Sequence, residues 1–79
     1  MSMKLTIAKV DEVLFNGKAV SLSCKGDLGD LTILPHHAPL VTSLKKGVMK
    51  VIDVEGKEFT FSVYDGVLEV GGNEVTVLL

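Results

Sequence analysis

Polar and apolar residues alternate along most of this chain, and glycine-rich or acidic turns interrupt the alternation at regular intervals. The segments Lys4–Lys9, Val20–Cys24 and Glu58–Tyr64 each alternate with a period of two, which is typical of a strand with one buried face. Strand and turn signals recur roughly every eight to ten residues, and no window has the apolar spacing of an amphipathic helix. We therefore predict a single all-β domain over residues 1–79, a β-sandwich or flattened barrel of about ten short strands.

The expected turns are rich in glycine and acidic residues. Glycine supplies positive φ at no steric cost, and Asp or Asn side chains bond to nearby main-chain groups. Aromatic residues make up only 5% of the chain, so we expect the core between the strands to consist mainly of valine, leucine and isoleucine. The predicted turns are Gly26–Asp30, Asp53–Gly56, Asp65–Gly66 and Gly71–Asn73.

The segment Leu34–Thr42 contains both prolines and both histidines of the chain. Proline fixes φ and has no main-chain N–H, so this segment is not suited to a helix interior or a central strand. Two apolar strand-like runs overlap its ends: Leu31–Leu34 leads into the segment and Leu40–Leu44 leaves it. The segment is therefore predicted to be a rigid loop that joins two strands.

Composition excludes several classes of partner and site. The formal net charge is −2, and all eight basic residues are lysines that form no basic stripe, which argues against nucleic acid as a partner. The single cysteine, Cys24, excludes an internal disulfide. No segment approaches the roughly 20 apolar residues that a membrane-spanning helix needs. We expect a soluble cytoplasmic domain without direct membrane insertion.

The residues that most resemble catalytic or metal-binding groups do not form a convincing site. His36 and His37 are adjacent, and side chains of adjacent residues on an extended chain point in opposite directions. Asp27 and Asp30 lie in a glycine turn, where both carboxylates are expected to be solvated. The chain has no nucleophile-elbow serine and no phosphate loop. We therefore predict no enzyme activity, no catalytic residue, no metal and no cofactor.

One alternative comes from the segment Val48–Val51, which is similar to the Met-Lys-Met modification site of biotinyl carrier domains. Such domains are also all-β and of similar length. Their modified lysine lies at a hairpin tip, whereas Lys50 is expected in the middle of a strand and the tip at Val54–Gly56. A carrier or other small all-β binding module remains the alternative, and biotinylation would appear as a mass increase of the intact protein.

Several blocks of the chain resemble the ε subunit of F-type ATP synthases, in its N-terminal β-sandwich domain. Val13–Gly17 is similar to that family's Leu-Phe/Tyr-x-Gly turn, and His36 stands where many members have glycine or asparagine. Most members continue into a two-helix C-terminal domain that is absent here, so inhibition of ATP hydrolysis and nucleotide binding are not implied. The matching blocks, in order, are Met3–Ile7, Val13–Gly17, Gly29–Thr42, Leu44–Val48, Asp65–Val70 and Asn73–Leu78.

The resemblance implies a mechanical role without chemistry. Domains of this family bind the γ subunit and rest on the ring of membrane c subunits, and together these parts form the central stalk, or rotor, that couples ion or proton transport to ATP synthesis. This implies a location at the cytoplasmic face of the bacterial inner membrane, as a peripheral part of the complex. The implied contact residues are Asp30, His37, Ala38 and Pro39 for the c-ring, and the apolar residues Val67, Leu78 and Leu79 for γ.

Overall fold

A computed structural model describes the whole chain, residues 1–79, and contains eight strands and no helix. The all-β sandwich and the aliphatic core are confirmed. The structure therefore holds no helix that is long and apolar enough to cross a membrane. The strands are β1 Met3–Lys9, β2 Glu12–Gly26, β3 Gly29–Ile33, β4 Leu40–Leu44, β5 Gly47–Asp53, β6 Glu58–Val63, β7 Gly66–Gly71 and β8 Glu74–Leu78.

The strand count is eight rather than about ten because β2 is a single strand of 15 residues. The prediction of a turn at Val13–Gly17 was wrong. Asn16 and Gly17 stay in the ladder because they pair with Thr6 and Leu5 of β1. The change of direction along β2 comes instead from irregularities in its pairing with β1 and with β5, and such bulges bend a strand without ending it.

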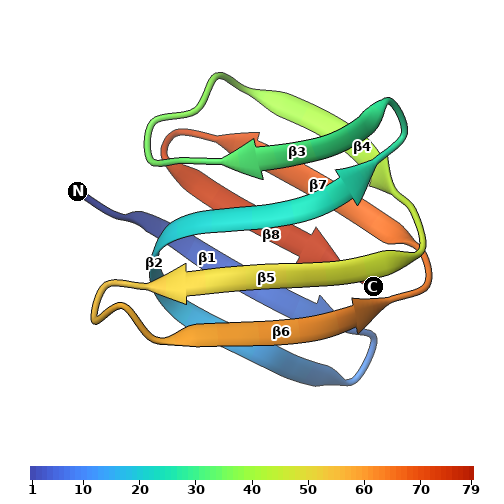
Figure 1. Ribbon diagram of the computed structural model, residues 1–79, viewed down its shortest axis with the longest axis horizontal. Coiled ribbons are helices and arrows are strands. Elements are labelled where there is room, and N and C mark those ends of the chain that lie inside the picture. The colour runs from blue at the N-terminus through green and yellow to red at the C-terminus, as the bar shows by residue number, and fades with distance from the viewer.

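The long strand β2 joins the two layers of the sandwich (Figure 1). Its first half pairs with β1, in the layer that continues through β8, β7 and β4 and lies at the back of the view. Its second half pairs with β3 and β5, and with β6 these form the front layer. The only parallel pairing is that of β8 with β1, which places the last strand between the first and the seventh.

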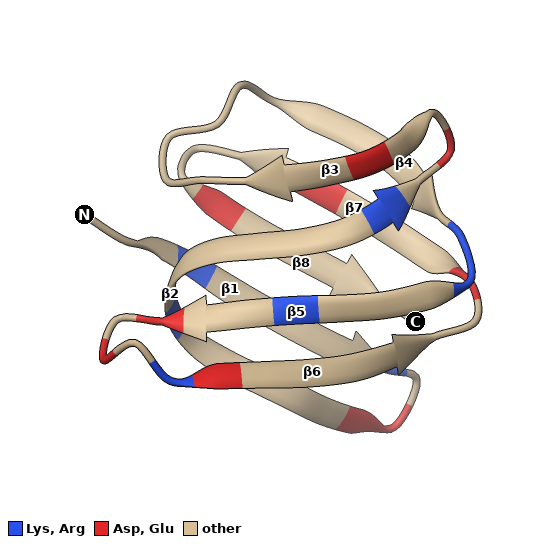
Figure 2. Cartoon of the chain, in the orientation of Figure 1, with Lys and Arg blue, Asp and Glu red and all other residues tan.

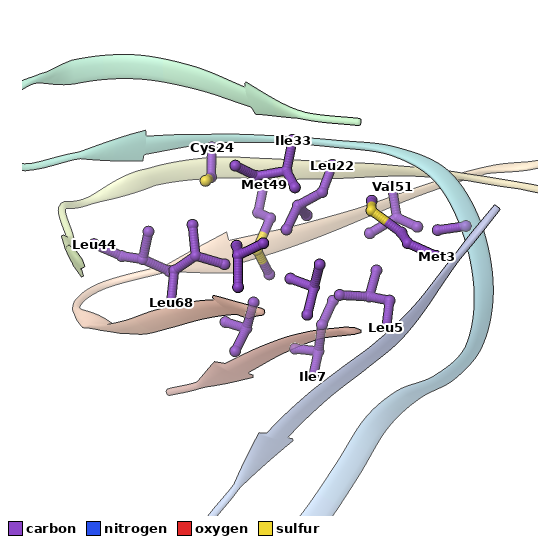
Figure 3. Close-up of a cluster of buried hydrophobic side chains, with 14 of the residues drawn as sticks. Met3, Leu5, Ile7, Leu22, Cys24, Ile33, Leu44, Met49, Val51 and Leu68 are labelled. Carbon is purple, nitrogen blue, oxygen red and sulfur yellow. The ribbon is translucent and has the colours of Figure 1, made fainter. Parts of the chain in front are cut away.

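The core between the layers is formed by 15 buried apolar residues, and no polar or charged residue is buried with them (Figure 3). Valine, leucine, isoleucine and methionine dominate, as Leu5, Leu22, Val51 and Leu68 illustrate. The core also contains the side chain of Cys24, and burial raises the pKa of its thiol to about 11. This thiol is therefore protonated near neutral pH and is a structural group rather than a nucleophile.

Two hairpin turns have the geometry that their residues favour. At the β7–β8 turn, both central residues, Gly72 and Asn73, have positive φ, 59° and 57°. This is a type I′ two-residue turn, whose twist matches that of the flanking strands and for which glycine and asparagine are the preferred residues. In the β5–β6 turn, the Asp53 side chain accepts the main-chain N–H groups of Glu55 and Lys57, each at 2.9 Å.

Candidate partner-binding surfaces

The edge strand β3 and the two loops that flank it form an exposed rim of the molecule, here called the β3 rim (residues 27–39). β3 pairs only with β2, so its other edge is open to a partner. The rim runs along the top of Figure 1, from the β2–β3 turn at one end to the β3–β4 loop at the other. Most of its side chains are exposed, including Asp27, Asp30, Thr32 and Pro39.

The β3 rim is acidic, because it contains Asp27 and Asp30 and no lysine (Figure 2). Lys25 lies opposite Asp30 in the β2–β3 ladder, but these side chains form no ion pair. The single ion pair of the structure joins Lys4 to Glu74 at 3.7 Å, on the back layer. The carboxylate of Asp30 is therefore free to bind a basic or polar group of another molecule.

The residues expected to contact the c-ring lie on one rim but not in one cluster. Asp30 is at the start of β3, whereas His37 and Ala38 follow the end of the strand. Ile33 lies three positions after Asp30 on an extended strand, a distance of about 10 Å. Between the two aspartates, the tip of the β2–β3 turn presents Leu28, which is fully exposed. We did not expect Leu28 in the site, although an apolar residue in an acidic glycine turn was the available signal.

The β3–β4 loop begins with a tight turn that its sequence specifies. The N–H of His37 donates to the Leu34 carbonyl at 3.1 Å, with Pro35 and His36 as the central residues. His36 has a φ of 64°, which makes this a type II turn. The third residue of such a turn favours glycine or asparagine, so His36 is an uncommon residue type at this position.

The histidines of this loop have different environments. The His36 side chain is exposed, whereas His37 is half-buried and its Nδ1 donates to the Ala38 carbonyl at 2.7 Å. In the neutral ring this leaves Nε2 as a free acceptor. No three His, Cys, Asp or Glu side chains in the structure lie close enough together to hold a metal ion.

Replacing His36 with glycine is expected to stabilise the domain by up to about 1 kcal/mol. Positive φ destabilises a residue that has a side chain by roughly 1–2 kcal/mol, and glycine removes this strain. The larger conformational entropy of glycine in the unfolded chain offsets only part of the resulting stabilisation. Thermal unfolding should show a Tm higher by up to about 6 °C. His37→Gly is the matched control, and because His37 lacks positive φ it should lower Tm. A lower Tm for His36→Gly would contradict the strain at this position.

The outer face of the back layer carries a line of apolar side chains across four neighbouring strands, here called the apolar row. Its members are cross-strand neighbours: Val13 of β2 faces Ala8 of β1, Ala8 faces Leu78 of β8, and Leu78 faces Val67 of β7. Val13, Leu78 and Val67 are 63%, 50% and 38% exposed. An exposed apolar line on a sheet face is the type of surface that proteins bind.

Two of the three residues expected to contact γ belong to the apolar row. Val67 and Leu78 pair directly, whereas Leu79 is half-buried against the core and its N–H donates to the Ala8 carbonyl at 2.9 Å. A Cβ on Gly66 would lie only 2.9 Å from Cδ2 of Leu79, which shows how closely Leu79 packs there. Sequence reasoning missed Val13 and Ala8, because their alignment with Leu78 depends on pairing between distant strands.

The outer face of the front layer is mostly polar, with Val48 of β5 as its exposed apolar residue. Ser23, Lys50 and Thr60 form a row across β2, β5 and β6, and all three point away from the core. Lys50 is the fourth residue of β5, and the following hairpin tip lies beyond Asp53. The expectation that Lys50 lies in the middle of a strand is confirmed, and this position differs from the tip lysine of a carrier domain.

Comparisons with known proteins identify a family for this sandwich. Residues 2–79 match the family model of the "ATP synthase, Delta/Epsilon chain, beta-sandwich domain". The chain is 37% identical over 78 residues to an ATP synthase epsilon chain of Xanthomonas oryzae pv. oryzae (strain PXO99A), and the match covers 99% of this chain and 56% of that relative. It is 36% identical over 77 residues to the epsilon chain of Xylella fastidiosa (strain Temecula1), covering 98% and 55%. The chain thus spans just over half the length of these curated relatives.

Two solved structures share the fold at low sequence identity. A chain in the Euglena gracilis mitochondrial ATP synthase (OSCP/F1/c-ring) superposes with a TM-score of 0.91 at 20% identity, over 98% of this chain and 49% of that one. A chain in the central stalk and c-ring of the Tetrahymena thermophila mitochondrial ATP synthase superposes with a TM-score of 0.81 at 17% identity, over 99% and 63%. At these identities the likeness concerns the fold.

Proposed function

Because the chain belongs to the family of ATP synthase delta/epsilon chain β-sandwich domains, we propose that it is a non-catalytic part of the ATP synthase central stalk. In this role it binds the γ subunit and the c-ring and couples ion translocation to ATP synthesis. It acts as a peripheral member of the complex at the cytoplasmic face of a bacterial inner membrane, in keeping with its bacterial relatives. It transmits force between partners and transforms no substrate.

The observation that carries this proposal is the presence of two exposed surfaces of different chemistry on one rigid sandwich. The β3 rim is acidic and open along one strand edge, whereas the apolar row crosses the outer face of the back layer. Continuous hydrogen-bonded pairing from β1 to β6 connects them. A body of this kind can hold two partners at once and pass force from one to the other.

The β3 rim is the proposed contact with the c-ring. Asp30 pairs with basic or polar groups of the c-subunit loops, and His37, Ala38 and Pro39 contact the ring through the β3–β4 loop. Two prolines and a tight turn restrict this loop, so little conformational entropy is lost when it docks. Leu28, exposed at the other end of the rim, adds an apolar contact that needs no rearrangement.

The apolar row is the proposed contact with γ. Leu78, which lies inside the row, and its direct neighbour Val67 are the proposed anchors, because exposed apolar side chains that become buried in an interface lose the most contact with water. Leu79 supports this surface by holding the end of β8 against Ala8, and its exposed part extends the contact. The mostly polar outer face of the front layer is left to solvent.

Reversing the charge at Asp30 is expected to weaken coupling without disturbing the fold. Asp30→Arg places a cation opposite the c-subunit groups that the carboxylate would bind, and the side chain is exposed, so the domain stays folded. ATP synthesis driven by ion flow in the reconstituted complex should fall about three- to tenfold, which corresponds to about 0.7 to 1.4 kcal/mol.

The matched control for this experiment is Asp65→Arg. It makes the same change of charge at an exposed turn residue between β6 and β7, outside the β3 rim. This control should couple as well as the wild type. Wild-type coupling by Asp30→Arg, with the variant assembled into the complex, would show that the rim does not contact the c-ring through this residue.

A further inference from the structure

The side chain of Asn73 joins three segments that are far apart in the sequence. Its Oδ1 accepts the main-chain N–H of His36 at 2.8 Å, across 37 residues. Its Nδ2 donates to the carbonyl of Ser2 at 2.9 Å, across 71 residues. Its own carbonyl accepts the N–H of Lys4 at 3.2 Å. The β7–β8 turn, the start of the chain and the β3–β4 loop therefore meet at one residue.

We propose that Asn73 is a positioning residue, whose side-chain amide holds the β3–β4 loop in the conformation that it presents to a partner. This inference rests on the proposed function, because the loop that Asn73 holds in place belongs to the proposed contact with the c-ring. Asn73 itself does not touch the partner. It acts through the main chain of His36.

The loop has few other hydrogen bonds that could fix its place. Pro35 and Pro39 have no main-chain N–H, and the N–H of His37 bonds within the loop, to Leu34. The ring of His37 also bonds locally, to Ala38. The bond from His36 to Asn73 is the only hydrogen bond between residues 34–39 and the rest of the molecule. The loop's internal shape is thus local, whereas its orientation relative to the sandwich depends on Asn73.

Both residues of this contact have positive φ. His36, with φ 64°, adopts a conformation that is uncommon for any residue other than glycine, and its N–H donates to the neighbouring turn. Asn73, with φ 57°, is a residue type that tolerates this conformation and also carries a donor and an acceptor. Glycine would fit the same turn, but it would remove the side-chain bonds to His36 and Ser2 and keep only the main-chain bond to Lys4.

This chemistry provides a matched pair of variants. Asn73→Gly keeps the type I′ turn and removes both side-chain bonds. Asn73→Asp keeps the acceptor for His36, removes the donor to Ser2 and places a carboxylate oxygen beside the Ser2 carbonyl, which must move away from it. If Asn73 served only the turn, the two variants would differ from the wild type only in Tm. If Asn73 positions the loop, the two variants differ from each other, because only the aspartate side chain can still accept the N–H of His36.

The first readout is amide hydrogen exchange of the folded protein by NMR, which does not depend on any partner. In Asn73→Gly, exchange at the His36 amide should accelerate at least about tenfold relative to the wild type, while the core amides of β1 and β8 keep their protection. In Asn73→Asp, the His36 amide should remain protected. Unchanged exchange at His36 in the glycine variant would overturn the proposal, whatever the effect on Tm.

The second readout is coupling in the reconstituted ATP synthase, measured beside Asp30→Arg. Asn73→Gly should reduce ion-driven ATP synthesis severalfold, and Asn73→Asp should stay close to the wild type. If Asp30→Arg impairs coupling but Asn73→Gly, with its loosened loop, does not, then the proposed function stands and the positioning role is overturned. If neither variant affects coupling, both the rim contact and the positioning role fail.

Discussion

An aspartate in place of Val77 should unfold this domain. Val77 has no exposed surface and packs between Ile7 of β1 and Leu68 of β7, in a core without a single polar partner. An unpaired buried carboxylate costs several kcal/mol even after local relaxation. Domains of this length have a total stability of about 4–12 kcal/mol, so the loss is comparable with the whole. Circular dichroism and NMR should show loss of the cooperative fold near neutral pH.

The pH dependence of this variant provides a check on the cause. Burial raises the pKa of a carboxyl in the folded state, so Val77→Asp should regain part of its structure as the pH falls from this raised pKa toward the usual pKa of an aspartate. Val77→Ala is the control without a charge, and it should fold at all pH values at which the wild type folds. A well-folded Val77→Asp at neutral pH would mean that this strand face is accessible to water, contrary to the described core.

The same substitution one residue later should leave the fold intact and abolish binding of γ. Leu78 points outward, is 50% exposed and lies at the centre of the apolar row. A carboxylate at this place would be desolvated in the interface, whereas in the free domain it remains in water. We expect the affinity for γ to fall by at least about 30-fold, equivalent to about 2 kcal/mol.

The measurement for Leu78→Asp is size-exclusion chromatography with light scattering, in a mixture with γ from the same source. The wild-type chain should elute as a stable 1:1 complex, and the variant should elute alone with an unchanged circular dichroism spectrum. Thr60→Asp, an exposed substitution on the outer face of the front layer, should still form the complex. Full binding by Leu78→Asp would place the γ contact elsewhere on the sandwich.

The residues of the proposed c-ring contact were implied by the family resemblance and not by the chemistry of the residues alone. Asp30 and the loop residues His37, Ala38 and Pro39 were expected in a partner contact, and the structure places them on one exposed rim. Their separation by the length of β3 was not expected, because a matching block shows the order of residues but not their distances. Leu28 was missed although its place in an acidic glycine turn was a local signal, whereas the contacts of the Asn73 side chain join segments far apart in the sequence.

Short-range physics determined most of the elements. Alternation with a period of two marks a strand wherever one face is buried, and glycine or asparagine marks the turns that need positive φ, as at Gly72 and Asn73. The proline pair likewise excluded regular structure from the β3–β4 loop. These properties depend on a residue and its immediate neighbours, so they can be read before the chain is folded.

Pairing between distant strands decided the rest. Asn16 and Gly17 have the composition of a turn, but hydrogen bonds to β1 keep them inside one long strand that connects both layers. The parallel pairing of β8 with β1 aligns Leu78 with Ala8 and so creates the apolar row. The free energy of such contacts comes from residues tens of positions apart, and only the folded structure brings them together.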